Sequence, residues 1–217
     1  MTTEYNLANL NTYLKKVISS VSGIKNKEKV ISRIVSLLDE ASQIVDLSLS
    51  DLLDGLDFQP NNYQVEKFEA FLAELRSIFW LSHFGFTEIA PLPKKKKSKN
   101  PDFKAKINNK NVVVEVFCLT KKHQQKRDSR LGVFINSYEK LEKSFAANIQ
   151  KVKKGQISSI DSEVKLLICV VNSDPISRLN TKEDFISILT KVHLSLDLDK
   201  SYSLGVLTGL MNFLQES

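Results

Sequence analysis

PDFKAKINNKNVVVEVFCL, residues 101–119, contains two short runs with strand composition separated by a polar turn. The first run covers residues 102–107, and the second, residues 112–119, is almost continuously apolar. Residues 108–110, Asn-Asn-Lys, join them, and this turn composition tolerates the positive φ angles of tight hairpins. The segment therefore predicts a β-hairpin.

Glu115 is the only charged residue of the second predicted strand. In a strand it shares a face with Phe117 and Leu119, and both faces of this strand are apolar enough to be covered. A buried carboxylate without a partner costs several kcal/mol or raises its own pKa. We therefore expect an arginine, a hydrogen-bond network or a cation beside Glu115, although a purely structural role stays open.

Outside the hairpin, the periodicity predicts further helices and strands in alternation. Helices are expected at 64–84, at 131–154 and from Thr181 to about His193, and strands at 86–90, 165–171 and 203–208. The order after residue 64 is α-β-β-β-α-β-α-β. This order predicts an α/β domain over residues 61–217 with a mixed central sheet flanked by helices.

The first 60 residues carry apolar residues at helical spacing and no convincing strand. Two amphipathic helices are predicted, around residues 7–18 and 30–45, with a short helical turn at 47–56. This helical N-terminal region, residues 1–60, is a bundle that either docks on the rest of the chain or pairs with a second copy. A homodimer is therefore one expected arrangement.

Two further acidic residues belong to the hypothesis for a metal site. Asp102 follows Pro101 at the start of the first hairpin strand, thirteen positions before Glu115, so a hairpin can bring the two carboxylates together. Two such oxygen ligands, with waters and a substrate phosphate, suit Mg²⁺ in a phosphodiesterase. Glu74 lies near the apolar stripe of the predicted helix 64–84. Considered alone, each of Asp102 and Glu74 also has a purely structural interpretation, because acidic residues at strand starts and at the edges of apolar helix stripes are common.

Three segments together resemble the PD-(D/E)xK nuclease superfamily, whose members have the restriction-endonuclease-like fold. The matching segments are AELRSIFWLSHFGF, PDF and VVVEVFCL, and the resemblance covers roughly residues 64–171. It implies a core of order α-β-β-β-α-β and Mg²⁺- or Mn²⁺-dependent hydrolysis of phosphodiester bonds in DNA or a related nucleic acid. It also implies that Asp102 and Glu115 hold the metal and that Glu74 supports it directly or through water.

The chain departs from this pattern at Phe117, where the family places a lysine two residues after the strand glutamate. Phenylalanine can neither activate a water nor stabilise charge at the phosphate. Lys121 lies on the same face by parity but six residues, roughly 20 Å at the rise of a strand, beyond Glu115. Three lysines of the next predicted helix are the other candidates to replace it: Lys140, Lys143 and Lys151. The alternatives are a catalytically degenerate nuclease fold that binds nucleic acid or acts as a scaffold, and an unrelated α/β interaction domain.

Basic residues concentrate in the middle of the chain. Residues 101–163 hold 13 Lys and Arg against 7 Asp and Glu, whereas residues 1–60 hold 6 against 8. Such a distribution suits a polyanionic partner such as nucleic acid. The lysine run before Asp102 supplies the candidate nucleic-acid-binding residues: Lys94, Lys95, Lys96, Lys97 and Lys99. A merely solvated loop is the competing interpretation, and residues 121–130 are expected to form a second basic loop.

The remaining sequence features exclude several classes of protein. The three histidines are scattered, so a zinc site built from them is not expected, and Cys118 and Cys169 are predicted to be buried free thiols. No run reaches the roughly 18 apolar residues of a membrane span, and the first residues lack a basic segment followed by an apolar one. We therefore expect a soluble cytoplasmic protein with no membrane partner.

Overall fold

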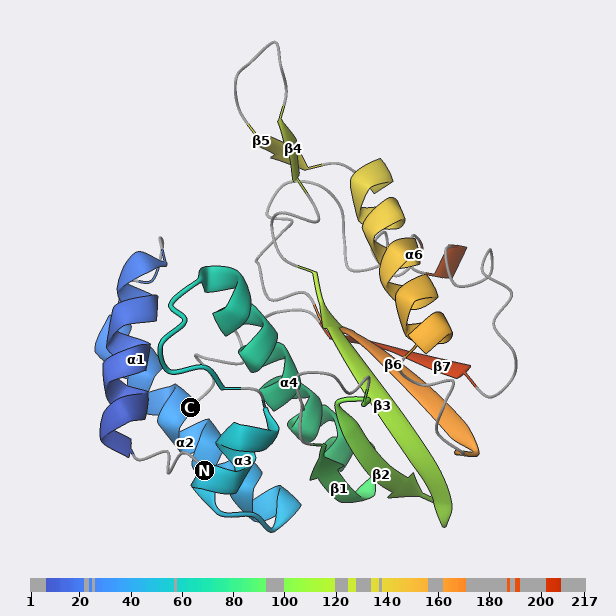
Figure 1. Ribbon diagram of the computed structural model, residues 1–217, viewed down its shortest axis with the longest axis horizontal. Coiled ribbons are helices and arrows are strands. Elements are labelled where there is room, and N and C mark those ends of the chain that lie inside the picture. The colour runs from blue at the N-terminus through green and yellow to red at the C-terminus, as the bar shows by residue number, and fades with distance from the viewer. Residues whose placement is uncertain are drawn as a thin grey trace.

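The structure of the chain is a computed structural model (Figure 1). It describes residues 7–21, 24, 26–56, 58–92, 100–119, 125–127, 134–136, 138–155, 162–170, 187, 190–191 and 202–207. The protein is a mixed α/β fold in which helices cover a five-stranded sheet.

The predicted helices of the N-terminal region are present as α1 (Leu7–Ser20), α2 (Lys27–Val45) and α3 (Leu49–Gly55). Two of them begin with a side-chain cap: Asn26 accepts a hydrogen bond from the Lys29 N–H, and Ser48 accepts one from the Asp51 N–H. The caps satisfy donors that the first helical turn leaves unpaired, which explains where these helices start.

The long helix α4 (Val65–His83) follows, and Gly85 with φ of 78° ends the turn behind it. α4 lies between the N-terminal helices and the sheet (Figure 1). Apolar side chains of α1, α2 and α3 form one continuous core with those of α4 and with one face of the sheet. The N-terminal region therefore docks on the rest of the chain, which is one of the two arrangements that its sequence left open.

The sheet has the strand order β1-β2-β3-β6-β7. The strands are β1 (Thr87–Pro91), β2 (Phe103–Ile107), β3 (Lys110–Cys118), β6 (Val164–Val170) and β7 (Tyr202–Leu207). β1 pairs with β2 and β2 with β3 antiparallel, whereas β3, β6 and β7 are parallel. The predicted hairpin is thus confirmed as β2–β3, and its turn residues Asn108 and Asn109 have φ angles of 48° and 62°.

The segment between β3 and β6 differs from the prediction. The helix expected at 131–154 is α6 (Tyr138–Gly155), and it is preceded by two short antiparallel strands, β4 (Gln125–Arg127) and β5 (Phe134–Asn136). Phe134 to Asn136 fit the helical stripe in sequence, but backbone pairing with β4 gives them strand geometry, so the predicted start of the helix was wrong. Part of the predicted basic loop 121–130 is likewise the strand β4.

The two faces of the sheet are covered by different helices. Val112 and Val114 of β3 belong to the core shared with α4, whereas the alternating residue Phe117 contacts Phe145 of α6, with ring centroids 5.4 Å apart. α4 and α6 lie on opposite sides of β3 (Figure 1). β3 is therefore covered on both faces, as its almost continuous apolar sequence predicts.

Two other predictions can be compared with the described residues only. Of the helix expected from Thr181 to His193, Ser187, Thr190 and Lys191 are described, and they have helical geometry. No helix among the described residues combines the length and the hydropathy that crossing a bilayer requires.

Candidate functional site

Three hydrogen bonds hold Asp102 at the start of β2. Two join it to β3, and the third joins it to Leu92, the residue after β1. Its N–H donates to the Val114 carbonyl at 3.0 Å, and its own carbonyl accepts from the Leu92 N–H at 2.9 Å. Its carboxylate oxygen Oδ2 accepts from the Val116 N–H at 2.6 Å. The side chain is only 5% exposed. Asp102 therefore extends the β2–β3 ladder with its carboxylate, which lies against the peptide bond that joins Glu115 to Val116.

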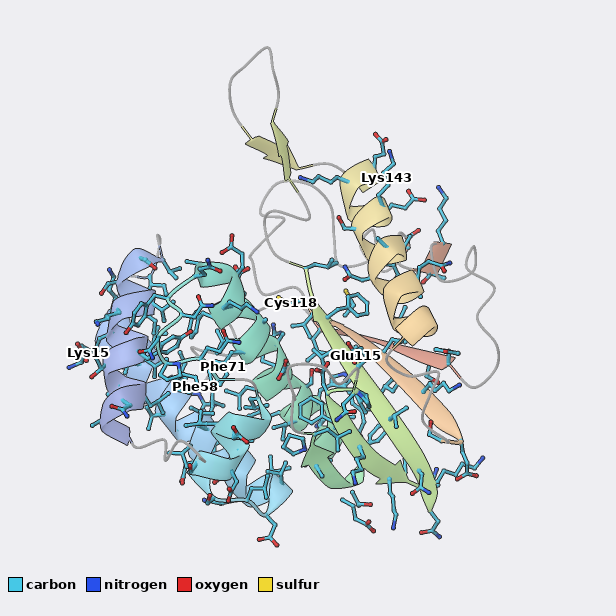
Figure 2. The ribbon with its side chains drawn as sticks, viewed as in Figure 1. Lys15, Phe58, Phe71, Glu115, Cys118 and Lys143 are labelled. Atoms are coloured by element: carbon cyan, nitrogen blue, oxygen red, sulfur yellow. The ribbon has the colours of Figure 1, made fainter. Side chains whose placement is uncertain are left out.

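Glu115 lies in β3, next to Leu167 of β6 in the parallel register, and is also 5% exposed (Figure 2). By strand alternation it shares the α6 side of the sheet with Phe117. Its Oε2 atom is buried and accepts no hydrogen bond from a described residue, although the residue interacts with its surroundings in other ways. The burial predicted for this carboxylate from the sequence is confirmed.

The hairpin thus fixes two buried carboxylates on paired strands. Among the described residues there is no group of three or more His, Cys, Asp or Glu side chains that could hold a metal ion. Two carboxylates are nevertheless a sufficient protein contribution for Mg²⁺, which keeps several waters and accepts substrate phosphate oxygens as further ligands. The donor set of Asp102 and Glu115, hard oxygen atoms only, fits Mg²⁺ or Mn²⁺ and not a thiophilic metal.

Glu74 lies on the other side of α4 from the sheet. It lines a cleft together with Tyr13 of α1 and Phe58, which follows α3. Arg76, by contrast, is about 200° away from Glu74 around the helix axis, at 100° per residue. The position of Glu74 therefore gives no support to the prediction that it assists a metal held by Asp102 and Glu115. The sequence placed Glu74 near an apolar stripe, and that stripe proves to contact the N-terminal helices as well as the sheet.

Arg76 is a buried charge that the sequence analysis did not identify. It is 5% exposed, and burial lowers its pKa to about 10, while an opposing electrostatic contribution from Cys118 at the end of β3 raises it. The guanidinium remains protonated at neutral pH. Arg76 therefore brings a positive charge from α4 to the carboxyl-terminal end of β3, three residues beyond Glu115.

Helical spacing from Trp80 places Arg76 on the sheet side of α4. Trp80, one turn after Arg76, faces the sheet so closely that a Cβ added to Gly205 of β7 would lie 3.1 Å from its ring. Residues at i and i+4 share one helix face, so Arg76 lies on the sheet side. Glu69 falls on the same face by its seven-residue spacing from Arg76 and is half-buried. The sequence pattern does not single out Arg76 or Glu69, because α4 is apolar around most of its circumference.

Phe117 stands at the position where the nuclease superfamily that the sequence resembles has a lysine, and its side chain packs in the core. Phe117 is 8% exposed and contacts Phe145, so its side chain is part of the core beneath α6. Lys143 of α6 is exposed and forms an ion pair with Glu139 at 2.6 Å. Lys143 thus points to the outer surface of α6, and Lys140 is half-buried.

The other predicted basic residues cannot be placed. Lys121, the first candidate to replace the missing lysine, lies outside the described residues, as does the side chain of Lys151. The whole candidate nucleic-acid-binding run, Lys94, Lys95, Lys96, Lys97 and Lys99, also lies outside them. The run is bracketed by Leu92, which bonds to Asp102, and by Asn100. These two flanking residues, and not the run itself, are placed by the structure, and Leu92 lies beside Asp102.

Replacing Asp102 tests how much of its role is structural. Asp102→Ala leaves the Val116 N–H without its acceptor, so we expect the free energy of unfolding to fall by about 1–3 kcal/mol. Asp102→Asn keeps an acceptor oxygen and should cost clearly less. Urea denaturation measures both, with Asp54→Ala as the control because Asp54 is exposed on α3. Equal losses for Ala and Asn would contradict the hydrogen-bonding role.

No protein-family model, no curated protein and no solved structure matches the chain in the three comparisons with known proteins.

Proposed function

We propose that the protein is a metal-dependent nuclease of the PD-(D/E)xK type, hydrolysing phosphodiester bonds in DNA or a related nucleic acid. The observation that carries the proposal is the Asp102 carboxylate bound to the Val116 N–H, directly beside the buried Glu115. Proteins bury acidic side chains reluctantly, and two on adjacent strand positions are most readily explained by a shared cation.

The order of elements supports the restriction-endonuclease-like core that the sequence resemblance implies. α4, β1, β2, β3, α6 and β6 follow each other as α-β-β-β-α-β, with the short strands β4 and β5 inserted before α6. The parallel pairing of β3 with β6 requires a crossover, which α6 provides. Fold alone does not establish activity, so the proposal depends on the two carboxylates.

In this proposal Asp102 and Glu115 hold Mg²⁺ or Mn²⁺, which supplies a Lewis acid and lowers the pKa of a bound water. Asp102 is oriented by its hydrogen bond to Val116, and Glu115 is fixed by its place in the middle strand of the sheet. Arg76 brings a positive charge to the same end of β3, but on the α4 side of the sheet, opposite the α6 side that Glu115 shares with Phe117. Lys121 stays a candidate for the role of the missing lysine.

A specific observation favours a second candidate, a degenerate nuclease fold that binds nucleic acid or acts as a scaffold. Phe117 occupies the lysine position and packs on Phe145, so the sheet is stabilised where a catalytic group is expected. Incubation of the protein with linear, branched and single-stranded DNA in Mg²⁺ or Mn²⁺ separates the candidates. Cleavage supports the nuclease, whereas binding without turnover supports the degenerate fold.

The lysine run gives a prediction that applies to both candidates. Replacing Lys94 to Lys97 with Ser should weaken binding nearly equally for unrelated DNA sequences, because lysines in such loops contact phosphates. Each lost contact should reduce the slope of log K against log salt by about 0.9 for duplex DNA. Fluorescence anisotropy at several salt concentrations measures the slope, with Lys15→Ser on α1 as the control. An unchanged slope means that the run is only a solvated loop.

A further inference from the structure

The strands β4 and β5 form a two-stranded antiparallel ribbon that is separate from the main sheet. In Figure 1 this ribbon lies beyond one end of α6, apart from the five strands of the main sheet. β4 contacts α6, and α6 begins at Tyr138, two residues after the end of β5 at Asn136. The ribbon is therefore an appendage attached to the helix that covers the Glu115 side of the sheet.

The composition of the ribbon is cationic. Its residues are Gln125, Lys126 and Arg127 in β4 and Phe134, Ile135 and Asn136 in β5. The two strands thus carry one lysine and one arginine and neither Asp nor Glu, and the chain just before β4, residues 121–124, adds two more lysines. Complementarity of charge therefore favours a polyanion as the partner of the ribbon.

The register of the two strands groups the residues of the ribbon by face. Gln125 of β4 is opposite Asn136 of β5. Two positions along, Arg127 is opposite Phe134. Because consecutive residues of a strand alternate between its faces, these four residues belong to one face and Lys126 belongs to the other. One face thus combines an arginine, two carboxamide residues and an aromatic residue.

These residue types are the ones that recognise base pairs in the major groove of B-DNA. Arginine forms paired hydrogen bonds with guanine, asparagine and glutamine do so with adenine, and phenylalanine makes apolar contact with the thymine methyl group. The major groove is about 12 Å wide and admits a two-stranded β-ribbon. The major groove of an A-form RNA helix is too deep and narrow for side chains to read. The ribbon therefore suits duplex DNA better than duplex RNA.

The ribbon is close enough to the carboxylates to contact the same duplex. Gln125, the first residue of β4, follows Glu115 by ten residues. Ten residues of chain span at most about 35 Å, which is about one helical turn of B-DNA. One bound duplex can therefore contact the ribbon and lie over Asp102 and Glu115 at the same time.

We propose that the β4–β5 ribbon reads base pairs in the major groove of duplex DNA, with Gln125, Arg127 and Asn136 as the residues that determine sequence preference. The proposal rests on the nucleic-acid binding that both candidates under the proposed function include, and it names the partner as duplex DNA with a preferred sequence. Phosphate contacts from the lysine run 94–97 would add affinity without such a preference.

Selection from a pool of DNA duplexes with a randomised centre tests the proposal on the full-length chain. The binding buffer contains EDTA, so that binding is measured without metal-dependent cleavage. The expected result is enrichment of a short motif that contains both G·C and A·T positions. A pool that stays random, no retention of duplex DNA, or preferential retention of duplex RNA in a parallel selection would overturn the proposal.

Substitutions in the ribbon separate base recognition from attraction to phosphates. Gln125→Ala and Asn136→Ala leave the net charge unchanged, and each should weaken binding to the enriched motif about 5- to 150-fold, the range of one bidentate base contact, by relaxing the preference at an A·T position. Arg127→Ala should act in the same way at a G·C position. Lys126→Ala on the other face should weaken all duplexes nearly equally, and Gln43→Ala on α2, where Gln43 is exposed, should change nothing.

Fluorescence anisotropy with the enriched and a random duplex measures these effects. An unchanged preference in all three variants of the reading face, or equal losses on both duplexes, overturns the proposal. If one variant does not fold, the other two and the selection on the unmodified chain decide the question. Turnover in Mg²⁺ judges the nuclease separately: a preference that depends on the ribbon without cleavage refutes only the nuclease, and cleavage without a preference refutes only the role of the ribbon.

Discussion

Glu115→Gln is expected to abolish metal-dependent cleavage of DNA while the protein stays folded. A metal ion contributes several kcal/mol of charge stabilisation in phosphodiester hydrolysis, so loss of one ligand should reduce the rate by roughly 10³-fold or more. Glutamine has the same shape but is a poorer metal ligand. The free energy of unfolding of the metal-free protein should not fall, because the substitution removes a buried charge from β3.

Cleavage of plasmid DNA in Mg²⁺ and calorimetric titration with Mn²⁺ measure the two expected losses. Glu88→Gln is the matched control, since Glu88 of β1 is an exposed acid that pairs with Lys106 at 2.8 Å. Cleavage by Glu115→Gln at the unmodified rate would contradict the nuclease proposal, as would the absence of divalent-ion binding to the unmodified protein. Asp102→Asn should lose cleavage in the same way, and it retains an acceptor for the Val116 N–H.

Phe117→Ala should lower the free energy of unfolding by about 3–5 kcal/mol, the usual cost of removing a buried phenylalanine. Phe117 packs between β3 and α6, and its ring lies 5.4 Å from that of Phe145. Phe145→Ala, which removes a fully buried ring, should cost a similar amount. Because both changes empty the same space, the double variant should cost less than their sum.

Urea denaturation of the two single variants and the double variant measures this coupling. Phe84→Ala provides the comparison, because Phe84 is 55% exposed and its removal should change the free energy of unfolding far less. A loss below about 1 kcal/mol for Phe117→Ala would show that this residue is not core packing. The position would then be available for a role in the site.

The local elements were predictable because each carries its own signal. The hairpin follows from two strand-like runs and the Asn108–Asn109 turn, and both asparagines adopt the positive φ that their composition allows. The strand β5 was missed because three residues are too few to show a period, and only pairing with β4 distinguishes them from the start of α6.

The burial of Glu115 was determined by the sequence alone, because a single acid within a continuous apolar run has no exposed face available on a covered strand. Which partners surround each charge was decided by the tertiary structure. Glu74 and Arg76 are two residues apart in one helix, yet the packing of α4 between two layers sends one toward α1 and the other toward β3. Local sequence fixes the angle between two side chains on a helix, but only the neighbours that bury the helix determine which chemical surroundings each side chain meets.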